Sequence, residues 1–95
     1  MVIGVGKITW RLHGCRSLKA KRVIVKAIIS RLRNKFNIAA AEVAANDIHQ
    51  KALIGFAIVG NDPKLVNSRM DKILNFVDSL GLAEMLDSDM EIINL

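Results

Sequence analysis

The sequence has little cysteine, few aromatic residues and no tyrosine. Its single cysteine, Cys15, excludes an internal disulfide, so we expect a reducing cytoplasm as the setting. Two histidines and one cysteine, scattered along the chain, do not match the ligand spacing of a zinc site. One tryptophan and three phenylalanines leave few candidates for stacking on nucleic-acid bases. We therefore expect no metal and no cofactor.

Long apolar runs are also absent, and the longest ones are too short for a membrane span. Met1 leads directly into the apolar segment Val2–Val5, without the features of a secretory signal. We expect one domain over residues 1–95, because chains of this size rarely divide into two cores. The 52% hydrophobic content is high for a soluble monomer and favours some apolar surface for a partner.

Acidic residues are missing from the first 41 positions. That segment holds ten Lys or Arg and no acid, whereas the segment from Glu42 onward holds four basic and nine acidic residues. The net charge of +5 is thus distributed very unevenly. Such asymmetry indicates an anionic partner on one side of the molecule. The alternative is a solvated basic face that binds nothing.

Hydrophobic periodicity predicts six elements in the order βαββαβ. The expected strands are Val2–His13, Asn37–Ala45, Gln50–Gly60 and Met85–Ile93. The expected helices run from an N-cap at Ser17 through Leu18 to Lys35, and from Asp62-Pro63 to Gly81. This order is the ferredoxin-like α+β arrangement, a four-stranded antiparallel sheet with both helices on one face. Right-handed crossovers put the first and third strands at its centre.

The first helix concentrates the excess charge. At 100° per residue, Lys19, Arg22, Lys26 and Arg33 fall within about 60° of one another, on one flank of the apolar face. Cations in a first helical turn are unfavourable unless an anion is present, because the helix dipole is positive there. We therefore predict that this helix binds RNA or DNA phosphates through Arg16, Ser17, Lys19, Lys21, Arg22, Lys26 and Arg33.

The aromatic residues define how such binding would occur. Strand alternation places Trp10 and Phe56 on the helix-covered side of the sheet, and Phe36 and Phe76 lie on or beside inward helix faces. The open sheet face then has no platform for stacking bases, unlike RRM domains. We expect contacts directed at the phosphate backbone, with weak sequence specificity.

The open face of the sheet carries apolar side chains on both central strands, which is unusual for a solvated sheet. We predict that it forms a homodimer interface, with residues Ile3, Val5, Leu53, Ala57 and Val59. On the last strand, Asp87, Asp89 and Glu91 alternate on one face. Metal binding is one interpretation, but charge pairing with Lys7 and Arg11 across the first strand is favoured.

Catalytic signals are weak. His13 and Cys15 are close in sequence, but no orienting group or oxyanion site accompanies them. Arg16 follows the first strand as a phosphate-binding arginine does in acylphosphatases, but the glycine-rich signature of those enzymes is missing. We expect no catalytic residue, no small-molecule substrate and no enzyme activity, and keep an acylphosphatase-like function as a minor alternative.

The chain resembles the YlxP family of small bacterial proteins of unknown function over nearly its whole length. The resemblance rests on the first strand, Arg16-Ser17-Leu18-Lys19-Ala20-Lys21-Arg22, Phe36-Asn37, Ala41-Glu42-Val43, Asp47, Gln50-Lys51-Ala52 and Asn61-Asp62. The chain departs from the family pattern at Ala44, Ala45 and His49, so the resemblance assigns no role to the 44–49 loop. It implies a ferredoxin-like domain, and genes of this family often lie among translation and ribosome-maturation genes.

Two functional hypotheses follow. The first is a non-enzymatic, RNA- or ribosome-associated protein that binds phosphates through the first helix. The second is a homo-oligomeric adaptor that acts through the open sheet face, with the basic helix serving solubility.

Overall fold

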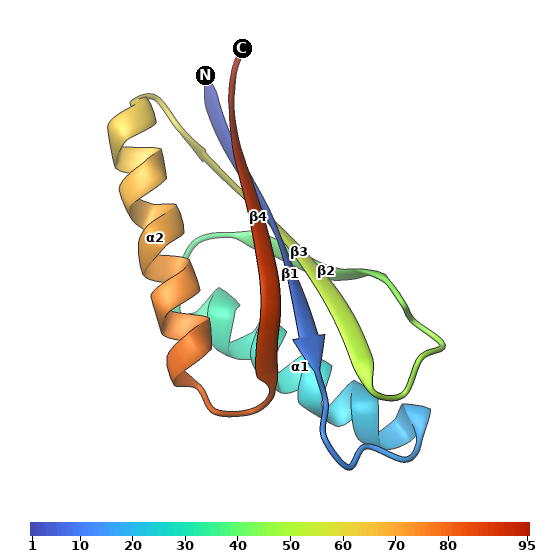
Figure 1. Cartoon of the computed structure of the whole chain (residues 1–95). Helices are drawn as coiled ribbons and strands as arrows, with labels where there is room; N and C mark the ends of the chain where they lie inside the picture. Colours follow the sequence, from blue (N-terminus) through green and yellow to red (C-terminus); the bar gives the residue numbers. More distant parts are fainter.

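The computed structural model describes all residues 1–95 and shows a four-stranded antiparallel sheet with two helices on one face (Figure 1). In chain order the elements are β1 (Val2–Arg11), α1 (Leu18–Lys35), β2 (Ala39–Ala44), β3 (Lys51–Gly60), α2 (Pro63–Ser79) and β4 (Glu84–Asn94). The strand order β2-β3-β1-β4 places β1 and β3 at the centre. The ferredoxin-like prediction is confirmed.

Both helices begin and end where the sequence predicts. Ser17 caps α1, because its side-chain oxygen accepts a hydrogen bond from the Ala20 amide at 3.0 Å. Asp62 caps α2 in the same way through the Lys64 amide, and Pro63 follows at the first helical position. Beyond α2, Gly81 adopts a φ of +67°, the left-handed conformation that commonly follows a helix end.

The core lies between the sheet and the helices, as strand alternation predicts. Ile8, Trp10 and Leu12 of the first strand region are buried, together with alternate residues of β3. From α2, the buried stripe consists of Val66, Met70, Ile73 and Val77. Neither helix is long and apolar enough to cross a membrane.

Helix periodicity in the sequence predicts Leu18, Val25, Ile29, Leu32 and Phe36 on the buried face of α1, but the observed face is rotated relative to that prediction. Its buried residues are Lys21, Val25, Ile28 and Leu32, whereas Leu18, Ile29 and Phe36 are only half-buried. The helix therefore packs through the row at positions i, i+4, i+7 and i+11 that begins with Lys21. This rotation directs one of the predicted binding residues into the protein.

Two glycines of β1 allow close packing on the covered face. A Cβ atom at Gly4 would lie 2.5 Å from the sulfur of Met70, so α2 rests directly on the backbone of β1. A Cβ atom at Gly6 would lie 2.2 Å from Cζ of Phe56, which pairs with Gly6 across the β1–β3 ladder. The Phe56 ring therefore occupies the space that a side chain at Gly6 would need.

We predict that Gly6→Ala lowers the free energy of unfolding by about 1–3 kcal/mol, because the added methyl group overpacks the core against Phe56. Combining it with Phe56→Leu makes room, so the double variant should lose less stability than the two single losses added together. Urea unfolding of the four proteins measures this coupling. Strictly additive losses would contradict the proposed contact.

Candidate nucleic-acid interface

Four cations form an exposed row on the flank of α1 that faces β2. We call Lys19, Arg22, Lys26 and Arg33 the basic stripe; all four side chains are exposed. None has a carboxylate within 4.0 Å, and α1 contains no acidic residue. Lys21 is the only lysine or arginine of the chain that forms an ion pair. The charge of the stripe is thus not neutralised within the protein.

Lys21 does not belong to this exposed surface. Its side chain is 1% exposed, and its ammonium group lies 2.7 Å from Oε2 of Glu42 on β2. The same ammonium donates a hydrogen bond to the carbonyl oxygen of Ala45. A buried ammonium with a carboxylate and a carbonyl as partners holds elements together and is not free to bind an external anion.

The backbone at Ala45 depends on this contact. Ala45 has a φ of +60°, the left-handed region that alanine seldom adopts. Its carbonyl accepts from both the Lys21 side chain and the Ile48 amide, which fixes the turn after β2. Lys21 therefore links the start of α1 to the end of β2 and to the following turn.

The sequence contains two features that fit this pair, although neither identifies it alone. Lys21 stands four residues before Val25, in register with Ile28 and Leu32, so it shares their inward face. Glu42 is the only charged residue in the alanine-rich strand β2. A lone acid on a strand beside the helix is a suitable partner for a buried lysine.

We predict that Glu42→Gln costs about 3 kcal/mol of stability, because it leaves the ammonium of Lys21 buried without a counter-charge. Lys21→Met should cost less, since Glu42 keeps 17% side-chain exposure and can be hydrated. The double variant Lys21→Met with Glu42→Gln should be more stable than Glu42→Gln alone, because it leaves no buried charge without a partner. Urea unfolding tests this, with Lys19→Ala and Asp47→Ala as exposed controls that should change stability by less than about 0.5 kcal/mol.

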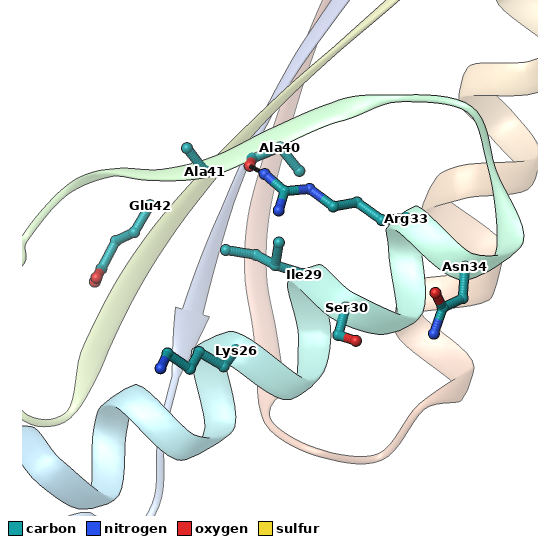
Figure 2. A pocket seen from close by; sticks show the side chains of 8 residues that line it. All are labelled: Lys26, Ile29, Ser30, Arg33, Asn34, Ala40, Ala41 and Glu42. Atoms are coloured by element: carbon teal, nitrogen blue, oxygen red, sulfur yellow. Dashed lines mark hydrogen bonds between the residues drawn. The ribbon is translucent and has the colours of Figure 1, made fainter.

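A groove of about 660 Å³ runs between α1 and β2 (Figure 2). On the helix side it is lined by Lys26, Ile29, Ser30, Arg33 and Asn34, and on the strand side by Ala40, Ala41 and Glu42. Figure 2 shows the Arg33 side chain reaching across to β2, where its Nη2 donates to the Ala40 carbonyl at 2.7 Å. Two stripe residues therefore lie in a groove whose strand wall is mostly alanine.

β2 supplies a main-chain acceptor to the same groove. β2 is an edge strand, and its Ala40 carbonyl accepts a hydrogen bond from Arg33. The carboxylate of Glu42 lines the groove as well, but Lys21 neutralises it.

The remaining predicted binding residues lie at the start of α1. Arg16 and Ser17 are exposed, but the Ser17 hydroxyl oxygen is already engaged by the Ala20 amide. The amides of Leu18 and Lys19 lie in the first turn and have no intrahelical acceptor. Arg16, Lys19 and Arg22 therefore gather at the positive end of the helix dipole, and Lys26 and Arg33 continue the row along the groove.

The open sheet face carries the predicted apolar residues. Ile3, Val5, Leu53 and Ala57 are half-buried, and Val59 is 60% exposed. Val43 on β2, which is 55% exposed, extends this surface, since its side chain lies over Gly55. No aromatic residue is present on this face, because Trp10 and Phe56 are buried on the other side.

The acidic residues of β4 are arranged differently from the expectation. Asp89 lies opposite Lys7 as predicted, but a bulge at Thr9/Trp10 shifts the register, so Arg11 lies opposite Glu84. Neither basic residue forms an ion pair with these acids. The predicted charge pairing is therefore only a cross-strand proximity, since no direct contact is made.

His13 and Cys15 do not come together. The imidazole Nε2 of His13 contacts the Glu84 carboxylate, whereas Cys15 is buried with its sulfur directed at the Ser17 carbonyl at 3.5 Å. His49 lies exposed in the turn between β2 and β3. No group of three or more His, Cys, Asp or Glu side chains is arranged to hold a metal ion.

Fold and surface together define a small ferredoxin-like α+β protein with an unneutralised basic helix flank. Comparison with known proteins gives its family. A model described as "Protein of unknown function (DUF503)" matches residues 3–90. The chain is also 31% identical over 78 residues to the uncharacterized protein YlxP of Bacillus subtilis (strain 168), covering 82% of this chain and 85% of that relative. The chain belongs to the DUF503 family, and the resemblance to YlxP is confirmed.

Proposed function

We propose that this protein is a non-enzymatic RNA-binding protein, associated with RNA or the ribosome, that holds the phosphate backbone on the basic stripe. One observation carries the proposal: Lys19, Arg22, Lys26 and Arg33 are all exposed on one helix flank and lack any acidic partner. Arg16 adds a fifth exposed cation at the start of the same helix. Lys21 is excluded from the surface because it is buried.

The dimensions of the stripe favour a polymer over a single small anion. Arg33 lies fourteen positions after Lys19, which is a distance of about 21 Å along the helix axis. Phosphates of one strand advance by about 3.4 Å per nucleotide along B-DNA, so the length of the stripe corresponds to several successive phosphates of a nucleic-acid strand. One strand is therefore long enough to contact several stripe cations at once.

The chemistry of the surface favours backbone contacts over base reading. On the strand wall of the groove, Ala40 and Ala41 offer no side-chain hydrogen bonds to a base edge, and the carboxylate of Glu42 is paired with Lys21. The open sheet face lacks the aromatic residues that RRM domains use for stacking. Recognition would then depend on charge and RNA shape, with weak sequence preference.

We predict that the affinity for a structured RNA falls with salt, with a log–log slope of about −3.5 to −4.5 for five phosphate contacts. Lys19→Ala with Arg22→Ala removes two contacts and should reduce the magnitude of this slope by about 1.4–1.8. Titration at several salt concentrations, by anisotropy of labelled RNA, measures both values.

The matched control replaces two exposed lysines outside the stripe, Lys51→Ala with Lys64→Ala, which removes the same net charge. This control should keep the wild-type slope. Binding without salt dependence, or an equal loss in the control and the stripe variant, would reject the stripe as the RNA-binding surface.

A second candidate function is a homo-oligomeric adaptor that acts through the open sheet face. The observation in its favour is the exposure of Val43 and Val59 beside half-buried Val5, Leu53 and Ala57 on a face that no helix covers. An apolar surface of this kind is typical of a protein interface. It is compatible with Lys19, Arg22 and Lys26 of the basic stripe, which lie in the helix layer, whereas Arg33 also borders the open face beside Val43 and Ala57.

For this candidate we predict that the wild-type protein is a dimer in sedimentation equilibrium. Val5→Glu and Leu53→Glu should each shift the protein to monomer, because the dimer interface would bury the new carboxylate without a partner. Leu65→Glu is the control, since Leu65 is 57% exposed on α2, away from the sheet face. It should leave the dimer intact. A monomeric wild-type protein would exclude the sheet-face dimer.

A further inference from the structure

A second basic surface lies on the other flank of the helix layer. A cavity of about 420 Å³ opens between the end of α1, the following connection, β3 and the middle of α2. It is lined by Lys35, Phe36, Asn37, Ile38, Ile58, Arg69, Lys72 and Ile73. No stripe residue contributes to it. Its volume falls in the range of pockets that bind small organic ligands.

The charges of this cavity are all of one sign. Lys35, Arg69 and Lys72 are exposed, none forms an ion pair, and no carboxylate is among the lining residues. Lys35 has a structural explanation, because it lies in the last turn of α1 and its ammonium sits 5.8 Å from the centre of the Phe76 ring. Arg69 and Lys72 lie in the middle of α2. The helix dipole favours cations only near the end of a helix, so it does not explain these two.

The rest of the cavity is apolar, with one amide. Ile58 and Ile73 are buried, and Phe36 and Ile38 are half-buried. The Phe36 ring is fixed by an edge-to-face contact with Phe76, with a centroid distance of 5.6 Å and an interplanar angle of 80°. Asn37 can both donate and accept hydrogen bonds. A ligand that fits this wall has an apolar, flat part with polar edges.

We propose that this cavity binds a nucleoside phosphate. Arg69 and Lys72 would hold the phosphate, since an arginine can take two phosphate oxygens at once. The base would lie against Phe36 and Ile38, where stacking on an aromatic ring is tolerant of base identity. The amide of Asn37 would meet the polar edge of the base. The ligand is either a free nucleotide or one unpaired nucleotide of an RNA strand.

The test is a titration of the ¹⁵N-labelled full chain, followed by amide chemical shifts. The probes are AMP, inorganic phosphate, adenosine and a single-stranded oligoadenylate. AMP should shift the amides of residues 35–38 and 69–73, and phosphate or adenosine alone should bind at least about tenfold more weakly. Arg69→Ala with Lys72→Ala should weaken AMP binding at least about tenfold, whereas Lys51→Ala with Lys64→Ala should not change it.

The oligoadenylate distinguishes the two sources of the nucleotide. If it shifts the same amides and loses affinity in Arg69→Ala with Lys72→Ala, the cavity accepts a nucleotide within a strand; if only AMP shifts them, it accepts a free nucleotide. The proposal is overturned if AMP leaves these amides unchanged, if phosphate binds as tightly as AMP, or if the Arg69 and Lys72 variant binds AMP normally. Because the stripe shares no residue with this cavity, either proposal can fail alone.

Discussion

The buried contact between Lys21 and Glu42 fixes the position of the first helix relative to the sheet edge. An ammonium that is 1% exposed is tolerated only with compensating partners, and here these are the Glu42 carboxylate and the Ala45 carbonyl. The requirement selects one rotation of α1 about its axis. That rotation turns Lys19, Arg22, Lys26 and Arg33 outward on the flank that faces β2. The exposed stripe is thus a consequence of where one lysine is buried.

The acids of β4 lie on the other side of the sheet from most of the basic stripe. The stripe lies on the flank of α1 that faces β2, and the cavity cations lie between the end of α1 and the middle of α2, so both sets belong to the helix layer. Asp87, Asp89 and Glu91 lie on the open side of the sheet, where their partners across β1 are Thr9, Lys7 and Val5. Because the sheet separates the two sets, the acids of β4 screen the helix-layer cations little. An anion approaching α1 meets only basic charged side chains, whereas α2 also carries the exposed acids Asp71 and Asp78.

Much of this architecture could be predicted from periodicity and capping. The buried faces of β1 and β3 and the starts of both helices follow from local sequence, since alternation and caps are decided by near neighbours. The strand order follows from applying right-handed crossovers to the βαββαβ sequence of elements. What could not be predicted depends on contacts between distant segments. Lys21 reads as one more cation of a basic helix until Glu42 is known to lie beside it. The bulge that moves Arg11 opposite Glu84 is likewise decided by strand pairing and not by either strand alone.

Arg33 connects the stability of the fold to the function proposed for its surface. An unpaired strand edge is a hazard, because its free N–H and C=O groups can recruit another strand. β2 is short, and Arg33 occupies one of its outward carbonyls, at Ala40. This contact uses one of the five N–H donors of the guanidinium, so the others can still reach an anion in the groove. Arg33 can therefore cover the strand edge and contact a phosphate at the same time. The small side chains of Ala40 and Ala41 leave room in the groove for both contacts.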